Sequence, residues 1–121
     1  MMRPPGEGHS YALDVGGWII AQITEVSQAP GGQVTLTRRL TGPGLDFETW
    51  LRHARLGGPH GSRRDGTLIA YDAYGHPTAH YVLRDAWPIS LHVVHPSTQG
   101  STTRVERLVL TFAALTPRRG G

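Results

Sequence analysis

The sequence predicts a mainly β protein, an antiparallel β-sandwich or barrel with one short flanking α-helix. Segments in which apolar and polar residues alternate recur along the chain, and this period of two is typical of strands with one buried face. The 121 residues include 16 glycines and 9 prolines, which indicate many turns and favour short strands. Only one stretch carries apolar residues at helical spacing. A chain of this length accommodates one domain with one core.

The part of the chain before the helix predicts three strands. Alternation begins in residues 11–15, resumes in residues 18–26 after a glycine turn, and returns in residues 33–40 after a second turn. In the third strand, Arg38 falls on the face that is otherwise apolar, whereas Arg39 falls on the polar face. Three strands are therefore expected before any helix begins.

A helix is predicted next, because four apolar residues fall on one stripe at positions i, i+3, i+4 and i+7: Phe47, Trp50, Leu51 and Ala54. Asp46 is placed to cap the helix N-terminus, and residues 57–59 (Gly-Gly-Pro) are predicted to end the helix. A helix of about ten residues is marginal in isolation. We therefore expect its aromatic stripe to pack against the strands.

Residues 63–88 contain the clearest predicted element, a β-hairpin. Its strands, residues 67–71 and 78–83, flank a turn in which the Asp72 side chain can accept a hydrogen bond from the backbone two residues on. Gly75 supplies a residue that tolerates positive φ. The second strand is expected to stop at Trp87-Pro88, since proline lacks a ladder donor.

Two more strands are predicted after the hairpin, at residues 89–94 and 104–115, with a polar loop between them. In the last strand, Glu106 shares a face with Leu108 and Leu110. The chain is expected to have a flexible N-terminal arm, a single β domain and a flexible C-terminal tail, at residues 1–10, 11–115 and 116–121.

The polar residues show no pattern that catalysis or metal binding requires. The chain has no cysteine and no HExxH sequence, and His76 and His80 are expected in a turn and a strand rather than on one helix face. The serines lack a nucleophile elbow, and the glycine-rich stretches lack the lysine of a phosphate loop. We therefore predict no enzyme, no catalytic or cofactor-binding residue, no metal and no cofactor.

The net charge of +3 comes mainly from arginine and permits contact with acidic partners. The basic residues are scattered, whereas a nucleic-acid reader more often shows a clustered stripe. No apolar run approaches the roughly 20 residues that a membrane-spanning helix needs. No membrane association is predicted.

Several segments occur in an order that carries a family resemblance. They are the opening strand at residues 11–15, Gly17, residues 23–27, the helix with Trp50, residues 63–66 (Arg-Arg-Asp-Gly), the Asp72, Gly75 and Pro77 turn, Tyr81-x-Leu83-x-x-Ala86-Trp87-Pro88, and residues 105–110. Across roughly residues 11–115, the chain resembles the tail tube proteins of contractile phages and of phage-derived contractile injection systems.

The resemblance implies a β domain that forms hexameric rings, which stack into the inner tube through which DNA or effectors pass. It implies self-association, contact with other tube, baseplate or sheath proteins, assembly in the bacterial cytoplasm, and a place in a virion tail or injection particle. The family's long inter-subunit hairpin is cut short here between Val26 and Val34. A minimal tube subunit, a tube initiator at the baseplate and a small separate oligomer all remain open.

The expected site residues are interface residues: Arg38, Arg39, Arg63, Arg64, Trp87, His95 and Thr98. Arg38 and Arg39 are candidates to line a lumen or to pair with a neighbour's acid, but solvated strand-end residues need no such role. Trp87 also suits a core position. The loop at residues 95–101 is either a contact between rings or a plain connection.

Two other functions are considered. A freestanding binding module would use an aromatic surface formed by Tyr71, Tyr74, Tyr81 and Trp87. An enzyme would need a pocket that brings His80 within hydrogen-bond distance of Asp72 or Asp85.

Overall fold

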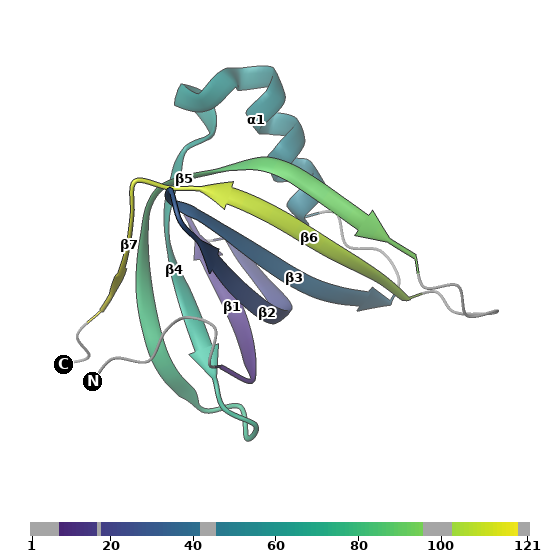
Figure 1. Cartoon of the computed structure of the whole chain (residues 1–121), viewed down its shortest axis with the longest axis vertical. Coiled ribbons are helices and arrows are strands. Elements are labelled where there is room, and N and C mark those ends of the chain that lie inside the picture. Colours follow the sequence, from purple (N-terminus) through teal and green to yellow (C-terminus); the bar gives the residue numbers. More distant parts are fainter. Residues whose placement is uncertain (1–7, 17, 42–45, 96–102, 119–121) are drawn as a thin grey trace.

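The computed structural model describes residues 8–16, 18–41, 46–95 and 103–118, in which one helix accompanies seven strands (Figure 1). The elements are β1 (Ser10–Val15), β2 (Trp18–Ala29), β3 (Gln33–Thr41), α1 (Asp46–Ser62), β4 (Arg64–Tyr71), β5 (Pro77–Val94), β6 (Thr103–Thr111) and β7 (Ala114–Pro117). The predicted fold class, mainly β with one helix, is confirmed.

The strands form a closed, entirely antiparallel barrel with one added strand. The order is β4-β1-β2-β3-β6-β5-β7, and a further pairing between β4 and β5 joins the two ends of the first six strands. β7 pairs with β5 outside this closed set. In Figure 1, β3, β6 and the second half of β5 run away from β1, β4 and the first half of β5. The barrel therefore has two halves that meet at a corner.

The two longest strands make this corner, because each changes its partner part-way along. β2 pairs with β1 up to Ile23 and with β3 from Ile23 onward. β5 pairs with β4 as far as Ala86 and with β6 from Trp87. Close to each change lies a non-glycine residue with positive φ, Gln22 at 66° and Asp85 at 51°. Such a left-handed residue turns a strand sharply and carries strain.

The prediction that the strand stops at Trp87-Pro88 is wrong. β5 continues through Pro88 to Val94, so the strand expected at residues 89–94 is the second half of β5. Pro88 adjoins a register shift between itself and Ser90. Proline is tolerated at such an irregularity because the regular ladder is already interrupted there.

The expected last strand, residues 104–115, is divided between β6 and β7. Its interruption at residues 112–113 lies opposite the corner of β5, where the Ala113 N–H donates to the Arg84 carbonyl oxygen at 2.9 Å. β6 follows the second half of β5 and β7 follows the first half. The break between β6 and β7 therefore lets this part of the chain follow the bend in β5.

The helix packs its predicted stripe into the core. Phe47, Trp50, Leu51 and Ala54 are all buried, together with apolar side chains from the barrel interior. The helix is longer than expected: it continues past residues 57–59 to Ser62. A proline fixes φ near the helical value and removes a single backbone hydrogen bond, so it does not always end a helix. The expected cap by the Asp46 side chain lies outside the described residues.

The predicted domain limits need small adjustments. β1 begins at Ser10, and the His9 N–H donates to the Tyr71 carbonyl oxygen at 2.8 Å, so the sheet extends into the expected N-terminal arm. β7 extends to Pro117, inside the expected C-terminal tail. Residues 1–7 and 119–121 lie outside the described part.

Candidate assembly surfaces

The second half of β5 presents an open strand edge. Residues 87–94 pair with β6 along one edge, and within the described ranges no strand pairs with the opposite edge. Ile89, Val93 and Val94, all in this half, are each 38–39% exposed. An edge strand with exposed apolar side chains is a template for pairing with another strand. This edge is therefore the first candidate contact surface.

Two other edges are open within the described part of the chain. β7 pairs only with β5. Residues 24–29 of β2 pair only with β3, because β1 meets β2 no further along than Ile23. A subunit with several open edges can pair with two neighbours at once, which is what a closed ring requires.

The outward face of β3, β6 and the second half of β5 carries the predicted Arg39. The strand register places Arg39 opposite Val105, and Arg107 opposite His92 on the next row. The three basic side chains are exposed, and among the described residues no ion pair joins them to an acid. This face is therefore exposed to solvent in the single chain.

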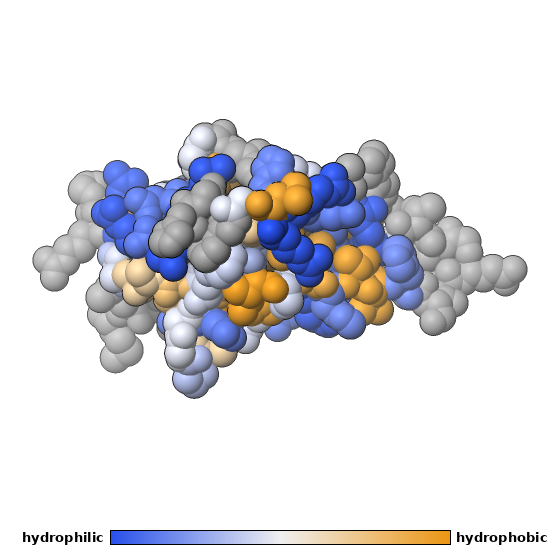
Figure 2. Space-filling model, turned by 90° about the horizontal axis from the view of Figure 1, so that it is seen from above, coloured by the Kyte–Doolittle hydropathy of each residue, from blue (hydrophilic) through white to orange (hydrophobic). Residues whose placement is uncertain are grey.

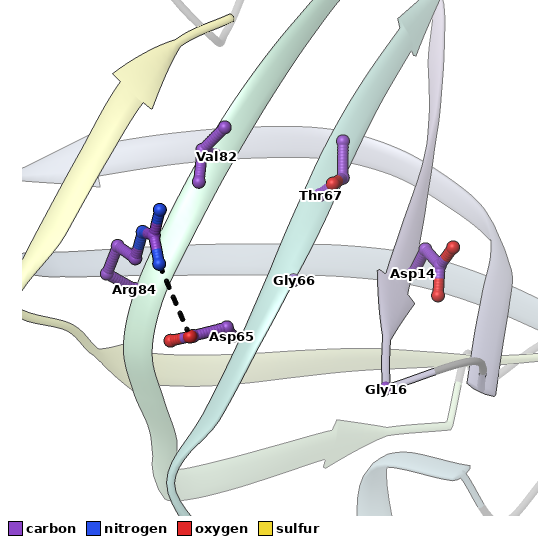
Figure 3. A pocket seen from close by; sticks show the side chains of 7 residues that line it. All are labelled: Asp14, Gly16, Asp65, Gly66, Thr67, Val82 and Arg84. Atoms are coloured by element: carbon purple, nitrogen blue, oxygen red, sulfur yellow. Dashed lines mark ion pairs between the residues drawn. The ribbon is translucent and has the colours of Figure 1, made fainter.

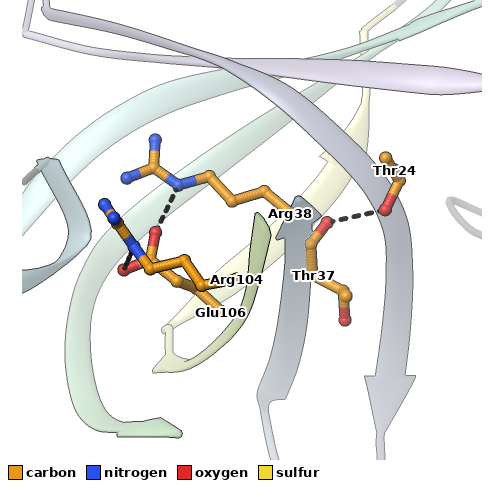
Figure 4. Close-up of polar contacts among 5 residues, drawn as sticks. All are labelled: Thr24, Thr37, Arg38, Arg104 and Glu106. Atoms are coloured by element: carbon orange, nitrogen blue, oxygen red, sulfur yellow. Dashed lines mark hydrogen bonds and ion pairs between the residues drawn. The ribbon is translucent and has the colours of Figure 1, made fainter. Parts of the chain in front are cut away.

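Arg38 lies on the opposite face and is only 2% exposed. Its Nε donates to Glu106 Oε1 at 2.9 Å (Figure 4). Its guanidinium carbon lies 4.3 Å from the centre of the Phe47 ring. Arg104 Nε approaches the other carboxylate oxygen, Glu106 Oε2, at 3.8 Å. Arg38 is therefore buried in the single chain and pairs with an acid of its own chain. Its role is to join β3, β6 and α1.

The other predicted interface residues are spread over the surface. Arg63 and Arg64 are exposed where α1 leads into β4, and His95 is exposed directly after β5. Trp87 is half-buried and lies opposite Thr111 at the corner of β5. Residues 96–101 of the expected loop, Thr98 among them, lie outside the described residues. Arg63, Arg64 and Trp87 thus lie outside β3, the strand that carries Arg39.

A shallow depression of about 320 Å³ lies on the outward face of β1, β4 and β5 (Figure 3). Asp65 Oδ2 and Arg84 Nη1 are 3.5 Å apart at its rim. It is lined by Asp14, Gly16, Asp65, Gly66, Thr67, Val82 and Arg84. The lining is open to solvent, unlike the enclosed apolar pockets that usually hold small-molecule ligands.

No arrangement for catalysis or metal binding is found in the described part of the chain. No group of three potential metal ligands occurs there. No hydrogen bond or ion pair joins His80 to Asp72 or Asp85 among those residues. No described helix combines the length and apolar character needed to cross a bilayer.

Sequence reasoning missed the open edge of β5 and the depression. The β-branched run in residues 89–94 was a signal that this segment is a strand, but edge status depends on partners that a local pattern does not specify. The depression combines residues from three strands, two of which are separated by about 50 positions.

A family model for the T4-like virus tail tube protein gp19 matches residues 21–116, most of the chain. The chain belongs to this tail tube family. Its members are structural tube proteins, and this chain is a structural tube subunit of that kind, as the resemblance implied. The coarse prediction of a particle component is confirmed with it.

Three solved structures share the tail tube fold at low sequence identity. A chain of the PVC extracellular contractile injection system sheath–tube complex in the extended state has a TM-score of 0.69 and 14% identity, over 91% of this chain and 88% of that one. The anti-feeding prophage tube-terminating cap has 0.69 and 13%, over 99% and 95%. Hcp1 from Flavobacterium johnsoniae has 0.64 and 14%, over 92% and 96%. No curated protein matches the chain.

Proposed function

We propose that this tail tube protein forms closed rings, with six subunits as the family resemblance implies, through the open edge of β5. The observation behind this proposal is that residues 87–94 pair with β6 on one edge only, within the described part of the chain. The segment also exposes the apolar side chains of Ile89, Val93 and Val94. Figure 2, which views the molecule from the α1 side, shows apolar patches within a mostly hydrophilic surface. Pairing with an open edge of the next copy would cover apolar surface and complete the backbone hydrogen bonds.

The partners and location follow the same proposal. The similar chains come from structures described as sheath–tube, cap and baseplate complexes. We therefore propose that this protein contacts other tube, baseplate or sheath proteins, that its rings surround a conduit for DNA or effectors, and that it assembles in the bacterial cytoplasm as part of a virion tail or injection particle.

The short hairpin between β2 and β3 bears on how rings stack. The two strands are joined by residues 30–32, with Gly31 and Gly32 at positive φ. This tight connection leaves no long arm in that position. Any stacking must therefore use another surface of the subunit. The three open possibilities, a main tube subunit, a tube initiator and a small separate oligomer, differ in how they stack.

The test is the size distribution of purified protein over a range of concentrations, by mass photometry and negative-stain microscopy. Wild type is expected to form rings with a central hole. Val93→Lys places a charge on the open edge and is expected to abolish rings while the monomer stays folded. Leu56→Lys is the matched control, because Leu56 is 81% exposed and lies on α1 rather than on β5. A wild-type monomer at every concentration would contradict the proposal.

The alternative of an aromatic binding surface is not favoured by the geometry. Tyr81 is buried in the core, Tyr74 is exposed on the hairpin turn, and Trp87 lies at the corner of β5. Together with Tyr71 these side chains do not form one surface.

A further inference from the structure

The turn between β4 and β5 is rigidly built and presents an exposed aromatic side chain. The backbone N–H groups of Tyr74 and His76 both donate to Asp72 Oδ1 at 2.9 Å. The Gly75 N–H donates to the Asp72 carbonyl oxygen at 3.1 Å, and the Asp72 N–H donates to the His76 carbonyl oxygen at 2.9 Å. Four hydrogen bonds thus fix a turn on which Tyr74 is 85% exposed.

Among the large hydrophobic side chains of the described residues, Tyr74 has the greatest exposed fraction. Tyrosine has a large apolar ring and only two rotatable bonds, so it loses little conformational entropy when it is covered. A turn that is already ordered loses little more. Tyr74 therefore has the properties of a contact residue that is prepared before binding.

The shallow depression lies at the other end of the same hairpin. β4 begins beside it, at Asp65 and Gly66, and ends at the turn that carries Tyr74. A Cβ built on Gly66 would lie 2.5 Å from the Asp14 carbonyl oxygen, so this position must stay without a side chain. A Cβ there would also lie 3.4 Å from Cγ2 of the buried Val15, so the missing side chain would project inward, and the glycine lets β4 approach β1 closely beside the depression.

The depression suits a tyrosine ring by its chemistry. Val82 and the backbone of Gly66 offer surface to the ring, and the carboxylates of Asp14 and Asp65 can accept a hydrogen bond from the phenol hydroxyl (Figure 3). Arg84 stands at the rim and can stack on an aromatic face. The depression, of about 320 Å³, is open to solvent, so a side chain of another subunit can enter it without any movement of the strands.

We propose that Tyr74 of one copy of this chain inserts into the depression of the next copy. Since the turn and the depression lie at opposite ends of one hairpin, the contact joins two different surfaces, head to tail. Such a contact leaves a free turn at one end and a free depression at the other, so it repeats from copy to copy. The proposal rests on the self-assembly proposed above and supplies a contact in place of the missing arm.

Cysteine cross-linking tests the contact directly, because the chain has no cysteine of its own. The full-length variant Tyr74→Cys with Thr67→Cys is oxidised at concentrations where wild type assembles, and the products are separated on a denaturing gel without reductant. Head-to-tail contact predicts a ladder of covalent multimers. Tyr74→Cys with Leu56→Cys is the matched control, since Leu56 is 81% exposed on α1 and does not line the depression, and it is expected to give no ladder.

The outcomes are distinct. A dimer from Tyr74→Cys alone would show turn-to-turn contact and overturn the proposal. Rings or tubes in the microscope without a ladder would overturn it while leaving the proposed function intact, whereas a wild-type monomer would remove both. As a second readout, Tyr74→Ala and Thr67→Trp, which fills the depression, are each expected to weaken association between copies about tenfold, with little change in melting temperature.

Discussion

Arg38 and Arg39 are adjacent in the sequence and have opposite surroundings. Arg38 is buried between Glu106 and the Phe47 ring, whereas Arg39 lies exposed on the outward face of β3. The difference arises from the strand period of two, which sends neighbouring side chains to opposite faces. Arg38 thus stabilises the interior of the protein, whereas the side chain of Arg39 remains exposed to solvent.

Of the two arginines, the buried Arg38 needs more compensating contacts than the exposed Arg39. Removing a charge from water is costly unless a partner of opposite charge and good hydrogen-bond geometry compensates for it. Glu106 is directly opposite Arg38 in the register of β3 and β6, so the pair forms without distorting either strand. The Phe47 ring adds a cation–π contact from α1. One charged group therefore connects the helix with two strands.

The largest effect is expected from Glu106→Ala, which leaves Arg38 buried without its acid. We expect a loss of about 3–5 kcal/mol in the free energy of unfolding. Denaturant unfolding followed by circular dichroism measures it. A loss below about 1 kcal/mol would mean that Arg38 reaches water in the variant and that the pair is not essential to the interior.

A smaller effect is expected when both partners are replaced, as in Arg38→Met with Glu106→Leu. Apolar side chains of similar volume avoid the desolvation cost, and methionine packs well against an aromatic ring. The double variant should lie within about 1 kcal/mol of wild type, with a large coupling energy in the double-mutant cycle. Additive losses would indicate that the two residues act independently.

On the outward face, Arg39→Ala and Arg107→Ala are each expected to change the free energy of unfolding by less than about 0.5 kcal/mol. Any effect should appear in the size distribution of the assemblies instead. The same unfolding titration, run beside Glu106→Ala, gives the comparison. A loss of more than about 1.5 kcal/mol at Arg39 would show that the two arginines do not differ in the way described.

The smallest effect concerns the carboxylate of Asp72, which accepts hydrogen bonds from the backbone of its own turn. The backbone N–H of His76 is the main cause that lowers the pKa of Asp72 below its usual value, near 3.9, and the Tyr74 N–H acts in the same direction. Because the folded pKa is the lower one, the stabilisation is present above about pH 4 and is lost as pH falls through the folded value. The amide shifts of Tyr74 and His76, followed by NMR, should titrate with a midpoint below 3.9. A midpoint at or above 3.9 would contradict this.

Local patterns predicted the local features well. The helical stripe from Phe47 and the turn with Asp72 accepting the Tyr74 N–H both follow from spacing along the chain. Alternation put Arg38 on the otherwise apolar face of its strand, but its side chain was expected at an interface or in solvent and not in the interior. Glu106 was also placed on the apolar face of its strand. The pairing of these two residues was not predictable, because they are 68 positions apart and no local pattern sets the register of β3 against β6.

The sequence-based predictions were wrong where pairing between distant segments outweighed the local preference of a residue. Pro88 suggested the end of a strand, but the barrel carries β5 past it at a register irregularity. Pro59 suggested the end of the helix in the same way. The corners at Gln22 and Asp85 have no glycine to mark them, since the closed barrel imposes their positive φ. The candidate surfaces depend on these corners and were therefore the least predictable part.

The partner change along β5 also has a consequence for how the chain folds. The first half of β5 meets β4 across a turn of a few residues, so this hairpin can form early and locally. β1 and β4 pair although 48 residues, 16–63, lie between them in the chain. Non-local pairing of this kind places barrels among the slower-folding domains, in the range of milliseconds to seconds. Until β6 arrives, the second half of β5 is open along both edges. The period of greatest risk for premature association of nascent chains is therefore the interval between hairpin formation and the pairing of β6.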